Sequence, residues 1–206
     1  FYFDGQTTLR STFSMPKTMT YNAPYTIAAW IYNPSVEGLE TILDCTESRN
    51  DLATIELRQG TDAQNGLVAH NASFENFGDA SACRMSAGSW HHWVVTYDGY
   101  MERIYLDGKL LREKNSFLMI RPQGNMTIGV GHDGSHRFTG YLNSIKMFDK
   151  AVSEVEIGTL FNAPCLHAES RPINASDLVV SAEATTPTLA KASITDTDGK
   201  PSRSGR

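Results

Sequence analysis

Two neighbouring stretches decide the fold of this chain: Gly88-Ser89-Trp90-His91-His92-Trp93-Val94-Val95-Thr96-Tyr97-Asp98-Gly99 and Arg103-Ile104-Tyr105-Leu106-Asp107-Gly108-Lys109. Each is a segment of alternating character that ends in Asp-Gly. An Asp-Gly pair between such segments is the strongest short-range signal for a β-hairpin, because both residues tolerate a positive φ. The two stretches therefore predict antiparallel β-structure with one strand that is rich in aromatic residues.

The same pattern runs through most of the chain, where short apolar or alternating segments stand between turn residues. Further strands are predicted at 1–3, 25–32, 41–44, 54–58, 66–70, 126–130 and 138–148. One short helix is predicted after Ser153, which is a suitable N-cap residue, and it should end before Pro164. Many short strands separated by turns indicate an all-β sandwich or barrel.

Several of these segments carry recognisable motifs: Phe3-Asp4-Gly5, Tyr25-Thr26-Ile27-Ala28-Ala29-Trp30-Ile31, Trp90-His91-His92, Tyr105-Leu106-Asp107-Gly108, Thr127-Ile128-Gly129, Phe138-Thr139-Gly140-Tyr141-Leu142-Asn143 and Ala151-Val152-Ser153-Glu154. In this order they resemble the laminin G-like domains of the concanavalin A-like superfamily. The resemblance covers about residues 1–161. It implies an antiparallel jelly-roll sandwich of two sheets with one short C-terminal helix. Asn143 departs from the pattern, since many relatives carry Asp there.

The composition changes after the predicted helix, and this change suggests a division of the chain. Residues 1–161 are predicted to form the jelly-roll domain, and residues 162–176 read as a linker. Residues 177–206 are rich in Thr, Ser, Lys and Gly, and we expect them to begin a further β-module or to form a flexible tail. The chain starts at Phe1 and has an unpaired Cys165, so we expect it to be a piece of a longer multidomain protein.

Charge and hydropathy exclude some partners. The 206 residues carry a net charge of −5 and contain no basic run, which argues against nucleic acid and anionic membranes as main partners. No run of about 18 apolar residues exists, so no membrane-spanning segment is expected. The resemblance places the protein outside the cell, secreted or at the cell surface.

Cysteines and sequons leave alternatives open. A disulfide between Cys45 and Cys83 is one interpretation, and buried thiols that behave as small apolar groups are an equally good one. N-glycosylation sequons begin at Asn71, Asn125 and Asn174, and they matter only in a secreted eukaryotic protein.

The histidine pair is a weak metal site. Neighbouring residues of a strand point to opposite faces, so His91 and His92 are not expected to hold one ion together. His92 is a candidate to line a ligand groove, although the resemblance favours a scaffold role for the whole Trp-His-His-Trp segment.

Aromatic residues near predicted loops are candidates for sugar stacking, because binding residues concentrate there. The candidate ligand-binding residues are Tyr32, His70, Phe74, Phe77, His92 and Tyr100, with Tyr141 as a further aromatic candidate. An ordinary strand connection with packed phenylalanines is the alternative for residues 71–79. The resemblance also implies calcium at the rim of the sandwich. Its hard oxygen ligands would come from Asp44, Asp79 or Asp133.

The usual catalytic motifs are missing from the sequence. The nearest approach to a paired-carboxylate strand is Glu37-Gly38-Leu39-Glu40, which reads as a loop. We therefore expect a non-catalytic recognition module that binds carbohydrate or a glycosylated surface. The alternatives are a structural or protein–protein interaction module of a larger extracellular assembly, in contact with other domains of the parent chain, and a domain associated with a glycoside hydrolase.

Overall fold

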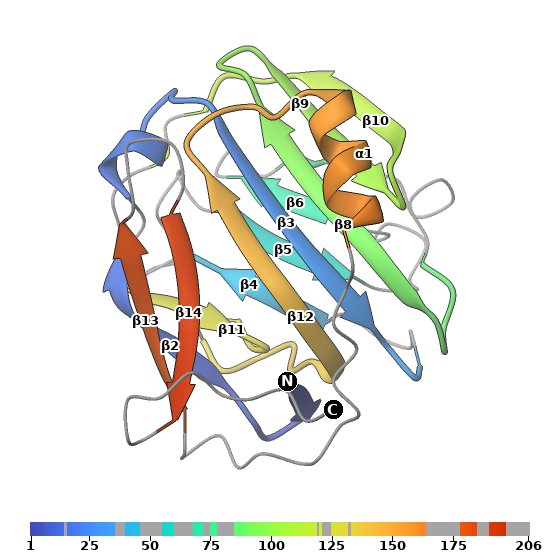
Figure 1. The fold of residues 1–206 in the computed structure, drawn as a ribbon, viewed down its shortest axis with the longest axis vertical. Helices are drawn as coiled ribbons and strands as arrows, with labels where there is room; N and C mark the ends of the chain where they lie inside the picture. Colours follow the sequence, from blue (N-terminus) through green and yellow to red (C-terminus); the bar gives the residue numbers. More distant parts are fainter. Residues whose placement is uncertain are drawn as a thin grey trace.

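The strands form two antiparallel sheets (Figure 1). The structure is a computed structural model that describes residues 1–14, 16–35, 40–45, 55–59, 68–71, 75–77, 85–118, 120, 125–131, 133–163, 178–184 and 190–196. Sheet A follows the spatial order β10 (Lys109–Asn115), β9 (Met101–Leu106), β8 (Trp90–Tyr97), β3 (Tyr25–Tyr32), β12 (Thr139–Phe148), β14 (Ala190–Asp196) and β13 (Leu178–Ala184). A short strand, β1 (Tyr2–Asp4), also pairs with β12.

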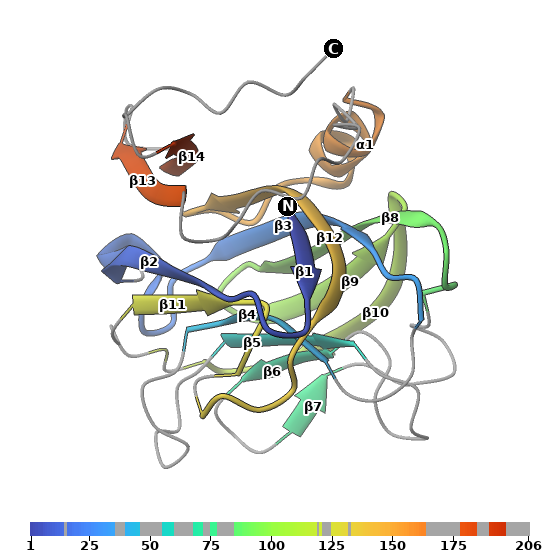
Figure 2. The ribbon, with the colours of Figure 1, turned by 90° about the horizontal axis from the view of Figure 1, so that it is seen from below.

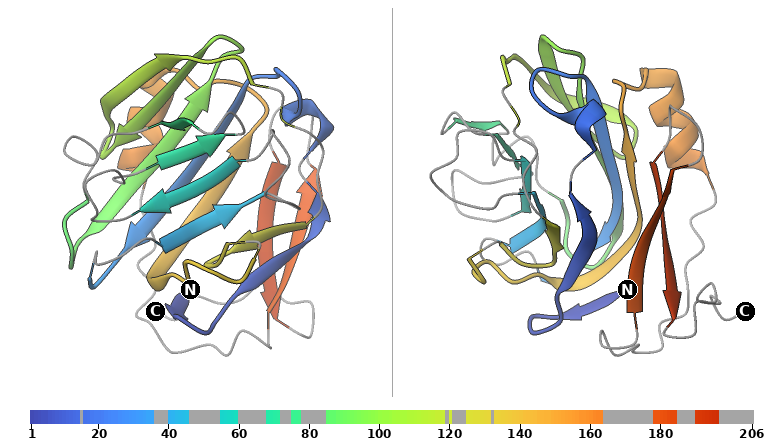
Figure 3. Two further views of the ribbon diagram at one scale, coloured as in Figure 1. Left: turned by 180° about the vertical axis from the view of Figure 1, so that it is seen from behind. Right: turned by 90° about the vertical axis from the view of Figure 1, so that its left-hand side faces the viewer.

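Sheet B covers one face of sheet A (Figures 2 and 3). Its order is β2 (Leu9–Ser14), β11 (Asn125–Ile128), β4 (Glu40–Asp44), β5 (Ile55–Gln59), β6 (Val68–Asn71) and β7 (Glu75–Phe77). A single-turn 3₁₀ helix, η1 (Lys17–Met19), precedes β3. The predicted sandwich of two antiparallel sheets with one short helix is confirmed.

Strand periodicity explains how sheet A divides its side chains. Alternate residues of a strand point to opposite faces. In β3 and β8 one set lies in the main core between the sheets: Tyr25, Ile27, Ala29, Ile31, Trp93, Val95 and Tyr97. The other set, which includes Ala28 and Val94, points to the outer face of sheet A. Both faces of sheet A therefore carry buried apolar side chains. One face packs against sheet B, and the other is the outer face.

The helix α1 (Glu154–Asn162) packs on that outer face (Figure 2). Its Ile157 joins a second apolar cluster with Ala28, Val94, Tyr105, Phe148 and Val152. Ser153 caps the helix, as the sequence predicts, and Glu156 completes a capping box. The Lys150 ammonium lies 2.6 Å from the Glu156 carboxylate and, with the Ser153 hydrogen bonds, lowers the pKa of Glu156 to about 2.

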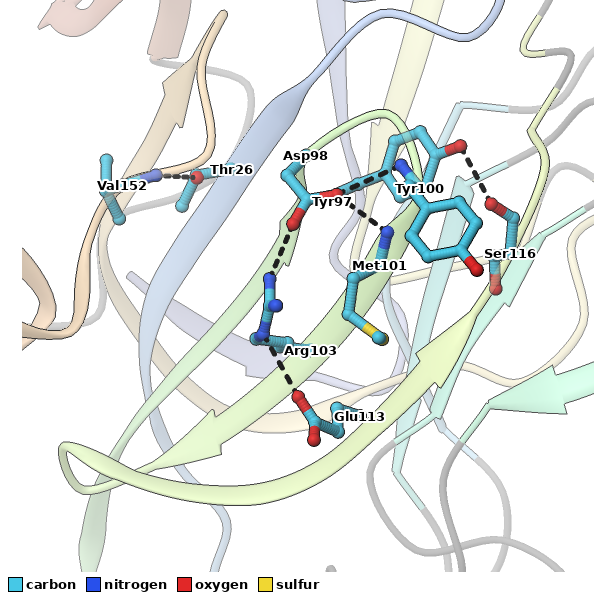
Figure 4. Close-up of polar contacts among 9 residues, drawn as sticks. All are labelled: Thr26, Tyr97, Asp98, Tyr100, Met101, Arg103, Glu113, Ser116 and Val152. Carbon is cyan, nitrogen blue, oxygen red and sulfur yellow. Dashed lines mark hydrogen bonds and ion pairs between the residues drawn. The ribbon is translucent and has the colours of Figure 1, made fainter.

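The approach to the helix is anchored on β3. Thr26 Oγ1 donates to the Lys150 carbonyl at 2.7 Å. It also accepts from the Val152 amide at 3.0 Å (Figure 4). The Thr26 side chain is buried, so these bonds are shielded from water and hold the start of α1 against sheet A. The position of the helix over the outer face is thus fixed at both ends of the connection.

The predicted hairpin of β8 and β9 is present, and β9 forms a second hairpin with β10, a strand that is not among those predicted from the sequence. Leu106 pairs with Lys109 across a two-residue turn in which Asp107 has φ 50° and Gly108 has φ 77°. Positive φ at both central residues is the backbone geometry that suits the twist of a hairpin. The first Asp-Gly, at Asp98-Gly99, lies in the longer connection between β8 and β9.

The C-terminal strands β13 and β14 form a hairpin that joins sheet A through the pairing of Met147 with Ala190. Both strands lie within the segment 177–206, for which the sequence predicts a further β-module or a flexible tail. The division of the chain into a domain at 1–161, a linker at 162–176 and a further module at 177–206 stays a prediction.

Candidate functional site

Four aromatic side chains form a row across the outer face of sheet A. The strand register pairs Tyr2 with Tyr141, Tyr141 with Tyr32, and Tyr32 with Trp90. Residues that are paired across strands point to the same face. The rings therefore lie side by side on β1, β12, β3 and β8, and we call this set the aromatic row.

The ring distances confirm that the row is continuous. The centroids of Tyr2 and Tyr141 are 4.9 Å apart, those of Tyr141 and Tyr32 are 5.7 Å apart, and those of Tyr32 and Trp90 are 5.7 Å apart. Tyr2 is 39% exposed, and the other three side chains are half-buried. Trp90 also lies 6.4 Å from Tyr141, so the rings of Tyr32, Tyr141 and Trp90 form a triangle, and Tyr2 lies beside Tyr141.

The end of α1 borders the row. One step along the strands, Trp30 pairs with His92, and Phe161 of α1 stacks on Trp30 at 5.7 Å with an interplanar angle of 17°. Phe161 of α1 thus covers the Trp30 and His92 rings. The aromatic row lies beyond this stack. Among the described residues, the aromatic row therefore lies beside the part of sheet A that α1 covers.

Polar side chains border the row along β12 and β1. Thr139 and Asn143 lie two residues on either side of Tyr141 and so share its face. Asp4 pairs with Thr139. Hydrogen bonds from the Thr7 and Gln6 amides lower the pKa of the Asp4 carboxyl, so it is an ionised acceptor at neutral pH. The site combines flat apolar faces with hydrogen-bonding groups at its edge.

The two histidines of the Trp-His-His-Trp segment point to opposite faces, as predicted. His91 Nδ1 lies 2.7 Å from Asp107 Oδ2, and His91 Nε2 lies 2.9 Å from Ser86 Oγ. Ser86, His91 and Asp107 are thus linked in the order of a nucleophilic triad. A catalytic triad also needs hydrogen-bond donors for the oxyanion. The Gly88 amide near Ser86 already donates to the Asn33 carbonyl at 2.8 Å.

Asp107 gives the arrangement a structural role. Its second oxygen accepts from the His92 amide at 2.9 Å, and its own amide donates to the His92 carbonyl at 2.8 Å. The carboxylate therefore ties the β9–β10 turn to the start of β8. Hydrogen bonds therefore link the Trp-His-His motif to the Asp-Gly motif and hold the β9–β10 hairpin against β8.

His92 is held in an unusual environment. Its side chain is buried, its ring lies 5.1 Å from Trp30 and 6.1 Å from Phe161, and its Nδ1 atom has no hydrogen-bond partner. Burial, reinforced by the nearby charge of Lys146, lowers the pKa of His92 to about 4, although Asp107 opposes the shift. The imidazole is therefore neutral at physiological pH.

Acid is expected to weaken the fold through His92. Its pKa is lower in the folded chain than the ordinary value near 6.5, so below pH 6.5 the unfolded chain binds a proton that the folded chain does not. Stability is then lost as the pH falls from about 6.5 to 4, by up to about 3 kcal/mol. Urea unfolding of wild type and His92→Phe at pH 7, 5.5 and 4.5 measures this loss.

The control for this experiment is His136→Gln, which removes a half-buried histidine from a turn far along the chain. We expect it to keep the wild-type loss of stability in acid, whereas His92→Phe should lose much of it. Equal pH dependence in wild type and His92→Phe would show that the buried imidazole does not matter.

The structure brings two of the candidate binding residues together, since Tyr32 and Tyr141 both lie in the aromatic row. His92 is buried, and its ring lies 6.1 Å from that of Phe161. Tyr100 is exposed in the β8–β9 connection, at the other end of β8 from Trp90. His70 and Phe77 belong to β6 and β7 of sheet B, where only the backbone is described. Phe74 lies outside the described residues.

The sequence analysis did not select Tyr2 or Trp90 as ligand-binding residues. Trp90 was read as part of a fold motif, and Tyr2 as part of an opening strand. The signal that would have found them is their parity with Tyr32 and Tyr141, which has meaning only when the pairing register of the four strands is known.

Two of the three candidate calcium ligands are described, and calcium binding stays a prediction. Asp44 is buried in β4, whereas Asp133 is exposed in a turn where its Oδ1 accepts from the Ser135 amide at 3.0 Å. Asp79 lies outside the described residues. In the part of the chain that the structure describes, no group of three or more His, Cys, Asp or Glu side chains is placed to hold a metal ion.

The remaining sequence candidates are covered only in part. Cys45 is a buried free thiol whose pKa is raised by burial, and Cys83 lies outside the described residues, so the bridge between them stays a prediction. Asn125 begins β11, Asn71 ends β6, and Asn174 lies outside the description. No helix within the described ranges is long and apolar enough to span a bilayer.

Several solved structures share this fold. Domain 4 of AbnA, an extracellular arabinanase of Geobacillus stearothermophilus solved in complex with arabinotriose, is 17% identical, with a TM-score of 0.64 over 78% of this chain and 75% of that one. A putative carbohydrate binding protein of Bacteroides ovatus is 16% identical, with a TM-score of 0.62 over 96% of this chain; the match spans 59% of that protein. The CBM40 domain of the Ruminococcus gnavus IT-sialidase is 13% identical, with a TM-score of 0.55 over 78% of this chain and 95% of that one.

The two antiparallel sheets, the outer helix and the shared architecture define a jelly-roll domain of the lectin-like class. Residues 3–158 match the family model of the concanavalin A-like lectin/glucanases superfamily. The chain belongs to this family.

Proposed function

We propose that this domain is a non-catalytic recognition module of an extracellular protein and that it binds an extended glycan chain along the aromatic row. The observation that carries the proposal is the alignment of four neighbouring rings on one sheet face, from Tyr2 to Trp90. These rings are tilted against their neighbours by 42°, 74° and 53°, and together they offer several apolar faces and edges to the sugar units of a glycan.

The binding chemistry follows from the two kinds of group at the site. The C–H face of a sugar ring is apolar and packs on an aromatic ring. Sugar hydroxyls would exchange hydrogen bonds with water for bonds to Asp4, Thr139 and Asn143 at the border of the row. Because Asp4 is ionised and accepts hydrogen bonds, it favours hydroxyl donors and disfavours anionic groups nearby.

The comparisons support the ligand class. The similar structures include a domain solved with arabinotriose, a putative carbohydrate binding protein and a domain of a sialidase. One fold hosts many functions, so the likeness favours a sugar ligand without naming it. The choice of the aromatic row rests on the geometry of this chain.

The row also bears on the question of hydrolysis. Glycoside cleavage requires two carboxylates about 5–9.5 Å apart across the scissile bond. The groups identified along the row are rings, a hydroxyl, an amide and the single carboxylate of Asp4. We therefore assign the row to binding alone.

Ligand length provides the first test. Each stacked ring contributes about 0.5–1.5 kcal/mol, so affinity should rise by up to roughly tenfold with each added sugar until the row is filled. Isothermal titration with neutral linear oligosaccharides of one to five units measures this rise, after a glycan array has selected the sugar. An affinity that does not change between one and four units would contradict binding along the row.

Calcium is tested in the same experiment. Stacking on the row needs no metal, so we expect its affinity to be the same with EDTA and with added calcium. A calcium-dependent affinity would instead move the site toward the rim loops and the predicted ligand Asp133. If no glycan binds in either condition, the domain is better described as a structural or protein–protein interaction module of the parent chain.

A further inference from the structure

A second group of aromatic side chains is exposed at the other end of β8. Tyr21 is 56% exposed, Tyr100 is 65% exposed and Phe117 is 73% exposed. They come from three loops: the segment after η1, the β8–β9 connection and the segment after β10. We call these three residues the rim cluster. Large apolar side chains gathered on one rim of a domain mark a contact surface.

Hydrogen bonds join the three loops. Asn22 Nδ2 donates to the Gly99 carbonyl at 2.9 Å, and the Ser116 amide donates to the Tyr100 carbonyl at 2.9 Å. The buried Tyr97 hydroxyl lies beneath them and donates to the Ser116 carbonyl at 3.0 Å (Figure 4). The backbones that carry the rim cluster are therefore held in one arrangement before any ligand arrives.

The foundation of the rim is a buried polar network. Glu102 is fully buried and accepts from the Tyr25 hydroxyl at 3.2 Å and from the Ser116 hydroxyl at 3.4 Å. Buried networks of this kind are rigid, because breaking one bond strands a polar group away from water. Burial and the neighbouring carboxylate raise the pKa of Tyr25 well above its usual value, so its hydroxyl stays a donor.

Tyr21 is presented at a cost in backbone energy. Its φ is 57°, which is uncommon for a residue with a bulky side chain. Tyr21 and Ile120 exchange backbone hydrogen bonds, and these hold the strained conformation. A strained backbone that carries an exposed apolar ring points to a function for that ring.

Three charged side chains near the rim cluster, Arg103, Asp98 and Glu113, are held in ion pairs. The Arg103 guanidinium lies 2.8 Å from the Asp98 carboxylate. Burial raises the pKa of Asp98, but the guanidinium opposes this effect and the net shift is downward. Arg103 also lies 3.3 Å from Glu113 (Figure 4). The Asn115 amide, a neutral group, donates to the Tyr100 hydroxyl at 3.0 Å. This chemistry suits an uncharged ligand with an apolar face and hydroxyl groups.

The size of the surface favours a small ligand over a folded partner. Aromatic side chains bury about 150–250 Å² each, so three rings that are partly exposed offer at most about 400 Å². A stable protein–protein interface needs about 800 Å² from each partner. The rim cluster is therefore large enough for one or two sugar rings and too small to hold a protein by itself.

We propose that the rim cluster is a second, independent saccharide site and that the domain binds neutral polysaccharide at two places. β8 spans eight residues, so its ends lie about 25 Å apart. The aromatic row is at the Trp90 end and Tyr100 lies beyond the other. The inference rests on the proposed function only for its ligand class, since each site has its own aromatic residues.

The two sites can be separated by variants. The row is removed by Trp90→Ala with Tyr141→Ala, and the rim by Tyr100→Ala with Phe117→Ala; Leu110→Ala, an exposed residue of β10, is the matched control. The probes are arabinotriose, xylotriose, cellotriose and mannotriose, with sialyllactose as a charged comparison. Binding is followed by NMR shifts of the Gly99 and Ser116 backbone amides, which lie in the rim loops and are present in every variant, and by retention on an insoluble polymer of the sugar that binds.

We expect a neutral trisaccharide to shift the rim signals in the row variant as in wild type, and the rim variant to lose these shifts. Retention on the polymer should fall roughly tenfold or more when either site is removed, because two linked sites give avidity. Rim shifts without row binding would support the rim site and overturn the row. Row binding with no rim shift for any sugar would overturn the rim site alone, and stronger shifts with sialyllactose would overturn its neutral ligand class.

Discussion

Replacing Trp90 and Tyr141 together by alanine is expected to lower glycan affinity at the aromatic row by about a hundredfold. Each substitution removes one stacking surface, which contributes about 0.5–1.5 kcal/mol beyond the apolar area that the ligand covers. The two losses add to roughly 3 kcal/mol, and each 1.4 kcal/mol is a tenfold change in affinity. Isothermal titration with the sugar selected on the array measures the change.

Two companion variants make the result specific. Trp90→Phe keeps a flat apolar ring at the same place, so it should retain most of the affinity. Leu110→Ala removes an exposed apolar side chain of the same sheet, outside the row, and should bind as wild type does. Both rings to be removed are half-buried, so thermal unfolding must show that the double variant is folded. Unchanged affinity in a folded double variant would refute the proposed site.

Replacing Gly140 by alanine is expected to destabilise the domain by about 3–5 kcal/mol. Gly140 has φ 149°, and a Cβ atom there would lie 2.2 Å from the Tyr32 carbonyl oxygen and 2.9 Å from Phe138 Cζ. The first contact is with backbone, which cannot rotate away, so β12 would have to move from β3. The row residues Tyr141 and Tyr32 lie on these two strands, so the change also disturbs the site.

Thermal unfolding provides the measurement, since each kcal/mol lowers the midpoint of a domain of this size by about 2–4 °C. Gly134→Ala is the matched control, because Gly134 has φ 80° but a Cβ there meets nothing within 4 Å. It should lose only about 1 kcal/mol from backbone strain. In α1, Gly158 has no positive φ, and a Cβ atom there meets nothing within 4 Å. Gly158→Ala should therefore add up to about 1 kcal/mol of stability. A Gly140→Ala protein as stable as Gly134→Ala would show that β12 adjusts freely.

Local patterns were sufficient for the framework. The Asp107-Gly108 turn has positive φ at both residues because the sequence supplies the two residue types that tolerate it. Ser153 and Glu156 form the capping box at the start of α1, and alternation places Trp93 in the core and His92 on the outer face. Each of these features depends on residues that are neighbours in the chain.

The candidate site depends on contacts that no local pattern contains. The rings of the aromatic row come from positions 2, 32, 90 and 141, and a shift of one residue in any pairing would turn a ring into the core. The position of α1 then decides which outer-face rings are covered. His92 and Trp30 lie under Phe161, whereas Tyr32 and Trp90 lie beyond that ring stack.

The sequence by itself therefore determined the kind of strand, the turns, the helix cap and the family of the fold, because these follow from φ preferences, alternation and short-range hydrogen bonds. Only the tertiary structure decided where the rings gather, which histidine is sealed and which rim exposes Tyr21 and Phe117. Register and layer packing bring together residues that are more than a hundred positions apart. Both depend on the packing free energy of the whole sandwich.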